Sequence, residues 1–161
     1  MNIFLTGGVQ TGKSTAITRA LAGKKLNIGG FKTVSRTYGE TGELGVFIVK
    51  ASDEAPDCGS FNLVGVRGSG FKSFPDVFDS EGCRILNADE KYDLILMDEL
   101  GMMEDDAACF REAVLRLLDG DTPVLGVIKP TRGVLPDMVR SRDDCTVIEL
   151  TAENRDSLPL H

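Results

Sequence analysis

The chain has 161 residues, of which 42% are hydrophobic and 27% are charged, a size and balance typical of one globular domain with its own core. Its formal net charge of −7 argues against a surface that binds nucleic acid. No apolar run reaches the length of a membrane span, and the first residues enter a strand pattern directly. We therefore expect a single cytoplasmic domain over residues 1–161, without a signal peptide or a membrane segment.

The first elements in chain order carry the most specific motif. Residues 2–6 form an apolar run suited to a buried strand, residues 7–14 read GGVQTGKS, and residues 16–21 continue with a helical apolar pattern. The middle segment fits the phosphate-binding loop G-x-x-x-x-G-K-[ST], and strand, glycine loop and helix stand in the order that this motif requires. The pattern predicts binding of the phosphates of a nucleotide.

Each residue type in this loop has a chemical task. Glycines let the backbone approach phosphate, and the N–H groups at the start of the helix form an anion site. We expect Lys13 to place a cation near the β- and γ-phosphates, Ser14 to offer its hydroxyl to Mg²⁺, and Thr15 to donate to the α-phosphate. The predicted nucleotide-binding residues of the loop are Gly7, Gly8, Val9, Gln10, Thr11, Gly12, Lys13, Ser14 and Thr15.

The middle of the chain contains strand patterns separated by turn residues, at 27–34, 44–49 and 61–66. Their spacing predicts an antiparallel hairpin region. Residues 67–75 are rich in glycine and serine and predict a mobile loop, whereas residues 76–90 look helical in spite of an internal glycine.

A second chemical signal follows this region. Residues 92–97 form a continuous apolar run, typical of a strand buried on both faces, and Asp98 and Glu99 come directly after it. This is the Walker B arrangement, in which the carboxyl end of a strand opens onto the ligand crevice. We expect Asp98 to stabilise Mg²⁺ through a coordinated water or Ser14, and Glu99 to orient or deprotonate the attacking water. An acid in this position favours hydrolysis over simple binding.

The last third of the chain alternates helix and strand patterns. They are a helix at 104–118, a strand at 123–128, a short helix starting at Pro136 and a strand at 146–150, after which Thr151 caps a turn. Such alternation predicts an α/β fold, a three-layer sandwich whose mainly parallel sheet carries the antiparallel hairpin as an addition. Glu104 either supports the site residues from behind or is a helix N-terminal acid favoured by the dipole, and we favour the second role. Met103 reads as a core residue.

Phosphoryl transfer also requires a cation that neutralises charge developing between the β- and γ-phosphates. Arg36 lies just beyond a predicted strand end, and Lys129 and Arg132 lie in the loop after the 123–128 strand. We select Arg36 and Arg132 as catalytic candidates beside Lys13 and Glu99. Asn154 and Arg155 follow the last strand, where they either hold the C-terminal turn or contact the base, and we favour the base.

The sequence argues against two other kinds of site. The cysteines, Cys58, Cys83, Cys109 and Cys145, are scattered and form no C-x-x-C pair, so we expect reduced thiols and neither a zinc site nor a disulfide framework. The only histidine is His161, which argues against a catalytic histidine triad and leaves proton chemistry to carboxylates, lysine or water.

Several motifs together resemble one family. Residues 98–104, DELGMME, resemble the D-E-[IL]-G-x-M-E signature of THEP1-type nucleoside-triphosphatases of the P-loop superfamily. Residues 30–33 with Arg36, residues 123–126 and residues 153–156 resemble further elements of that family in the same order. The resemblance implies Mg²⁺-dependent hydrolysis of nucleoside triphosphates to diphosphate and phosphate with broad base tolerance. Met102 departs from it, because that position is commonly lysine in the family.

These features favour an NTPase that uses Lys13, Ser14, Asp98 and Glu99 around Mg²⁺ and a triphosphate. Two alternatives remain from the sequence. A small nucleotide or metabolite kinase would transfer the phosphoryl group to a second substrate, with Arg140 and Arg142 as a basic lid. A nucleotide-gated binding module would bind triphosphate tightly, turn it over negligibly and serve a partner protein, although Glu99 counts against it.

Overall fold

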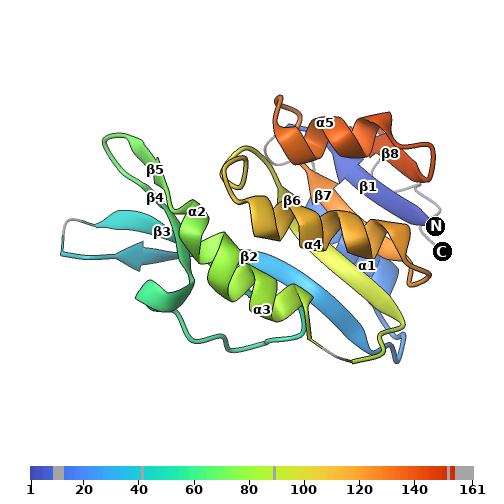
Figure 1. Ribbon diagram of the computed structural model, residues 1–161, viewed down its shortest axis with the longest axis horizontal. Helices are drawn as coiled ribbons and strands as arrows, with labels where there is room; N and C mark the ends of the chain where they lie inside the picture. Colours follow the sequence, from blue (N-terminus) through green and yellow to red (C-terminus); the bar gives the residue numbers. More distant parts are fainter. Residues whose placement is uncertain (9–12, 41, 89, 152, 155–161) are drawn as a thin grey trace.

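An eight-stranded sheet forms the centre of the computed structural model (Figure 1), which describes residues 1–8, 13–40, 42–88, 90–151 and 153–154. The strand order is β5-β4-β3-β2-β6-β7-β1-β8. The strands are β1 (Asn2–Thr6), β2 (Ile28–Tyr38), β3 (Glu43–Lys50), β4 (Leu63–Arg67), β5 (Phe71–Ser73), β6 (Leu94–Leu100), β7 (Val124–Ile128) and β8 (Cys145–Glu149).

The sheet has a parallel part and an antiparallel part. Strands β2, β6, β7, β1 and β8 run parallel to one another, whereas β3 pairs antiparallel with β2, and β4 and β5 continue outward as antiparallel strands. The parallel strands β1 and β7 are almost wholly buried, as expected where helices cover both faces of a sheet. The predicted fold, a mainly parallel sheet with an antiparallel hairpin addition, is therefore confirmed.

Helices cover the two faces unequally. Helix α1 (Lys13–Leu21) packs on one face through Ala16 and Ile17, which join Leu96 in a core cluster. The opposite face carries the larger cluster and the remaining helices, and this layering is visible in Figure 1. Those helices are α2 (Pro75–Val77), a π-helical segment (Phe78–Gly82), α3 (Cys83–Leu86), α4 (Ala108–Asp119) and α5 (Val134–Ser141), and a 3₁₀ turn (Ser60–Asn62) precedes β4.

Several element boundaries differ from those predicted. The segment 67–75, predicted as a loop, contains strand β5, which pairs with β4 as a short hairpin whose glycine- and serine-rich composition indicated only the turn. The helix predicted at 76–90 ends at Leu86, and the helix predicted at 104–118 begins only at Ala108 because residues 101–106 form turns. Helix α5 begins two residues before Pro136, which fits a proline in the first helical turn.

Gly30 occupies the closest backbone contact between β2 and β6. Its φ is +92°, and a Cβ added there would lie 1.9 Å from the carbonyl oxygen of Leu96. We expect Gly30→Ala to lower the free energy of unfolding in urea by about 4 kcal/mol, since strain of about 1–2 kcal/mol at positive φ is added to the displacement of a central strand.

Gly39→Ala is the matched control for this substitution. Gly39 also has positive φ, +72°, but a Cβ there meets nothing within 4 Å. The control is therefore expected to show only the strain, about 1–2 kcal/mol. Equal losses for the two variants would contradict the assigned backbone collision.

Candidate active site

The carboxyl ends of the parallel strands bring the two predicted motifs together. The phosphate loop follows β1, and Asp98 lies in β6, two strands away in the sheet. Lys13 begins α1, and its ammonium donates hydrogen bonds to the carbonyl oxygens of Gly7 and Gly8, each at 2.9 Å. The ammonium of Lys13 therefore lies at the start of α1 beside the end of β1, where the loop motif places a cation.

The predicted loop extends beyond the described residues. Val9, Gln10, Thr11 and Gly12 lie outside the described residues, and so does the side chain of Ser14. Thr15 is exposed in the first turn of α1. The predicted contacts of these residues with phosphate or Mg²⁺ therefore stay predictions.

Asp98 projects from the sheet face that α1 covers. Leu96 packs with α1, and side chains two residues apart on a strand share a face. Burial and the neighbouring carboxylate of Glu99 raise the pKa of Asp98 to about 6, while Lys13 and Lys32 act in the opposite direction. The carboxyl group is therefore mostly shielded from water, and the two lysines offset only part of the cost of ionising it.

Lys32 is a site cation that the sequence analysis did not select. It pairs in register with Asp98 across β2 and β6, and its ammonium donates to the carbonyl oxygen of Asp53 at 2.6 Å. No local motif marks it, because its closeness to Asp98 depends on which strands become neighbours. The sequence feature that could have pointed to Lys32 is a lysine within an otherwise apolar strand pattern.

Glu99 lies where the ladder between β6 and β7 is interrupted. Asp98 pairs with Val127 and Leu100 with Ile128, which leaves Glu99 as the extra residue of a bulge. Bulges turn a side chain away from the regular alternation of a strand. The peptide bond before Glu99 is cis, and its carboxylate lies 3.9 Å from the ammonium of Lys129.

The two arginines selected from the sequence lie away from this cluster. Arg36 is inside β2, not beyond a strand end, because the strand continues into the hairpin; it stands four residues past Lys32, or about 13 Å along the strand. Its guanidinium donates to the carbonyl oxygen of Ser35. Arg132 is 91% exposed and forms an ion pair with Asp137 of α5 at 2.9 Å. Their proposed roles at the phosphates stay predictions.

Asn154 holds the turn after β8. Its side chain accepts from the backbone N–H of Thr151 and donates to the carbonyl oxygen of Glu149, and Thr151 in turn accepts from the N–H of Asn154. The predicted cap at Thr151 is confirmed. These bonds give Asn154 a part in holding the turn, and the favoured contact with the base stays a prediction. Arg155 lies outside the described residues.

Glu104 differs from its expected setting. It precedes α4 by a full turn, so it is not an acid of that helix, and its side chain is 1% exposed. Burial raises its pKa to about 7, against the lowering effects of the backbone N–H of Gly101 and the charge of Lys129. Met103 beside it is buried in the core, as predicted, and Met102 is exposed.

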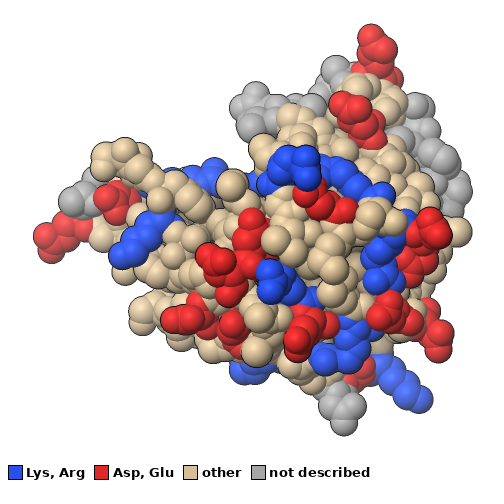
Figure 2. Space-filling model, turned by 45° about the horizontal axis from the view of Figure 1, so that its top comes forward, with Lys and Arg blue, Asp and Glu red and all other residues tan. Residues whose placement is uncertain are grey.

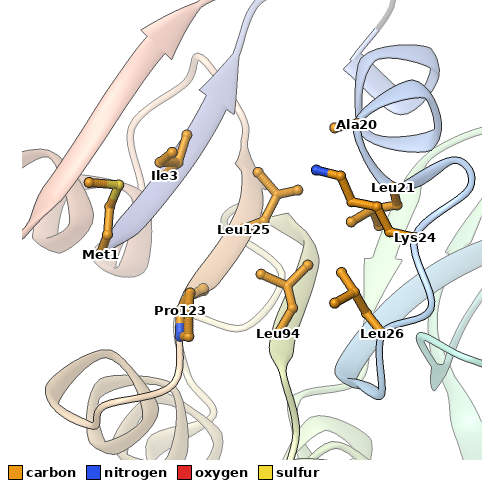
Figure 3. Close-up of a pocket in the computed structure, with 10 residues that line it drawn as sticks. Met1, Ile3, Ala20, Leu21, Lys24, Leu26, Leu94, Pro123 and Leu125 are labelled. Carbon is orange, nitrogen blue, oxygen red and sulfur yellow. The ribbon is translucent and has the colours of Figure 1, made fainter. Parts of the chain in front are cut away.

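Further hollows lie outside this cluster, and one of them, of about 510 Å³, is open, lies near α5 and is lined by Arg132, Asp137 and Arg140. An apolar hollow of about 210 Å³ lies at the opposite edge of the sheet, where Ile3, Leu94 and Leu125 come from the strands and Lys24 reaches across (Figure 3). Figure 2 shows acidic and basic side chains interleaved over the visible face. All four cysteines are free, and none of the described helices is long and apolar enough to cross a membrane.

Comparison with known proteins decides the family. The model of a family described as NTPase matches residues 2–161. The chain belongs to this NTPase family. It is accordingly an enzyme that hydrolyses nucleoside triphosphates, and the THEP1-type resemblance is confirmed.

Individual relatives agree with this assignment. The chain is 32% identical to the nucleoside-triphosphatase THEP1 of Thermotoga maritima, over 98% of this chain and 91% of the relative. It is 30% identical to the protein of the same name from Methanosarcina barkeri, over 99% and 93%. The crystal structure of THEP1 from Aquifex aeolicus shares the fold, with a TM-score of 0.71 at 22% identity over 98% of this chain and 94% of that chain.

Proposed function

We propose that this NTPase is a cytoplasmic, Mg²⁺-dependent enzyme that releases the γ-phosphate of nucleoside triphosphates through Lys13, Asp98 and Glu99. The observation that supports the proposal most is that these side chains converge at one edge of the sheet. The charges of Glu99 and Lys13 both act on the carboxyl group of Asp98. The four free thiols fit a reducing compartment.

The donor set of the site fits Mg²⁺. This ion prefers oxygen ligands, keeps several waters and is commonly held by one or two carboxylates together with substrate phosphates. Among the described residues no three His, Cys, Asp or Glu side chains gather as a ready metal cage, which agrees with such an open site. Burial and the neighbouring charge of Glu99 raise the pKa of Asp98, and a bound divalent cation would favour its ionised form. Asp98 and Ser14 would hold the ion, and bound Mg²⁺ would neutralise charge on the phosphates.

Glu99 is proposed to act on the attacking water. Its carboxylate projects from the bulge and pairs with Lys129 at 3.9 Å, a separation that leaves its oxygens free to accept a proton-donating water. Lys13 would exchange its bonds to the loop carbonyls for phosphate oxygens, and Lys32 would add a second positive charge beside Asp98. Both cations would stabilise the charge that develops as the γ-phosphoryl group leaves.

Phosphate release tests the proposal directly. Purified protein is expected to release phosphate from ATP and GTP with Mg²⁺ alone, and EDTA is expected to stop the release. Turnover that appears only when a second, phosphoryl-accepting substrate is added would instead support the kinase alternative. Tight triphosphate binding with negligible release would support a binding module.

Asp98→Asn is expected to shift the Mg²⁺ requirement. The amide keeps the shape of the side chain but removes its charge, so the Mg²⁺ concentration for half-maximal activity should rise by about 10-fold, the equivalent of roughly 1.4 kcal/mol. The measurement is a Mg²⁺ titration at saturating nucleotide. Asp93→Asn, an exposed carboxylate at the amino end of β6, is the control, and an unchanged requirement in Asp98→Asn would remove Asp98 from the metal site.

A further inference from the structure

Glu104 is a buried carboxyl group that the proposed chemistry does not use. It lies in the turn between β6 and α4 with 1% of its surface exposed. One carboxylate oxygen accepts a hydrogen bond from the backbone N–H of Gly101, and the other, Oε2, has no partner in the part of the chain that the structure describes. Burying an unpaired carboxylate oxygen costs free energy of folding. We therefore expect the carboxyl group in this tight turn to have a role that offsets the cost.

The turn that holds Glu104 is fixed at several points. Asp105 accepts from the N–H of Val134, at the start of α5, at 2.9 Å. Arg111 of α4 donates to the carbonyl oxygen of Asp105 at 2.5 Å. The turn thus joins the end of β6 to α4 and α5. The buried hydrogen bond from the N–H of Gly101 to Glu104 spans the turn.

Lys129 connects this turn to Glu99. Its backbone N–H donates to the carbonyl oxygen of Leu100 at 2.9 Å, and its stem crosses Gly101 so closely that a Cβ there would lie 2.9 Å from Cδ. Its ammonium lies 3.9 Å from Glu99 and also acts electrostatically on Glu104. Lys129 therefore packs its stem against Gly101, whose N–H Glu104 holds, and pairs its ammonium with Glu99.

We propose that Glu104 is a positioning residue for Glu99: it fixes Gly101 through the backbone N–H and thereby seats Lys129, which orients the Glu99 carboxylate. The inference rests on the proposed role of Glu99 toward water. Glu104 touches no phosphate in this arrangement and acts only through Gly101 and Lys129. The acceptor oxygen at Gly101 is the essential feature, and a side chain that preserves it preserves the geometry.

Three substitutions at Glu104 test the acceptor. Glu104→Gln keeps an oxygen for Gly101, so kcat should stay within about 3-fold of wild type, the equivalent of about 0.6 kcal/mol. Glu104→Leu removes the acceptor, and Glu104→Asp withdraws it by one methylene. Both are expected to lower kcat by about 10- to 100-fold, as for a small displacement of a catalytic group, with KM within about 2-fold of wild type. Glu104→Asp serves if the leucine variant does not fold.

A second carboxylate in the same turn provides the control. Asp106→Asn changes an exposed carboxylate of the same turn and should leave kcat unchanged. Wild-type kcat in folded Glu104→Leu or Glu104→Asp would overturn the proposal. So would a loss of kcat in Glu104→Gln as large as in Glu104→Leu, or a rise in KM that accounts for the loss of kcat/KM.

A double-mutant cycle with Lys129→Met tests the route to Glu99. If Glu104 acts through Lys129, the double variant Glu104→Asp, Lys129→Met should be no more than about 3-fold slower than Lys129→Met alone, because coupled residues are not additive. Fully multiplicative losses would overturn the link. Glu99→Gln in parallel separates the failures: if it is as active as wild type, the role of Glu99 is wrong, whereas if it is slow and the Glu104 variants are not, only the present inference fails.

Discussion

Glu99→Gln is expected to lower kcat for phosphate release by about 10²- to 10⁴-fold, the usual contribution of a general base. The amide retains the size of the side chain but cannot accept the proton from water. Nucleotide affinity should change little, since the ion pair that Glu99 forms among the described residues is with Lys129. The measurement is single-turnover hydrolysis of ATP and GTP, together with the Kd for a non-hydrolysable triphosphate.

Glu112→Gln is the matched control for Glu99→Gln. Glu112 is exposed on α4, so its amide variant should hydrolyse as fast as wild type. Hydrolysis by Glu99→Gln at the wild-type rate would show that water is activated without this carboxylate. The substrate phosphate or another side chain would then have to take its proton.

Lys13→Met is expected to weaken triphosphate binding by about 100-fold or more. One charged hydrogen bond contributes about 1.5–3 kcal/mol, and the ammonium has at least two such donors to offer, as its bonds to Gly7 and Gly8 show. Methionine preserves the length and the apolar stem. Isothermal titration with a non-hydrolysable triphosphate gives the Kd, and kcat/KM should fall at least as far.

Lys24→Met provides the comparison for Lys13→Met. Lys24 lies at the opposite edge of the sheet, over the apolar hollow of Figure 3. Removing its charge changes the net charge by the same amount, so any long-range effect on the anionic ligand is matched. Equal losses of affinity in the two variants would mean that net charge, not local contact, governs binding.

The parallel core could be predicted because its signals are local. Residues 7–14 contain a complete motif, and the runs 2–6 and 92–97 are too apolar for a surface strand. Asp98 could be placed beside the loop for the same reason, since the carboxyl ends of parallel strands share one edge. These inferences needed no knowledge of strand order.

The remainder depended on long-range contacts that a pattern does not contain. Lys32 reaches the site only because β2 pairs with β6. Glu104 was predicted to be an acid at a helix N-terminus because the helical spacing of apolar residues begins before Ala108, where α4 starts. Arg36 seemed to lie at a strand end because the hairpin extends β2 beyond the residues that pair with β6. For Lys32 and Arg36, strand pairing overrides the local pattern, whereas for Glu104 a turn occupies the residues that the helical spacing predicted.

The place of β1 between β7 and β8 makes the strand before the phosphate-binding motif depend on distant parts of the chain. Its two neighbours come from residues 124–128 and 145–149. During synthesis, the motif therefore leaves the ribosome before either neighbour of its strand. Contacts of such high sequence separation carry a loop-closure cost and slow folding. We expect truncation before β8 to remove one of the two neighbours of β1 and thereby to weaken nucleotide binding.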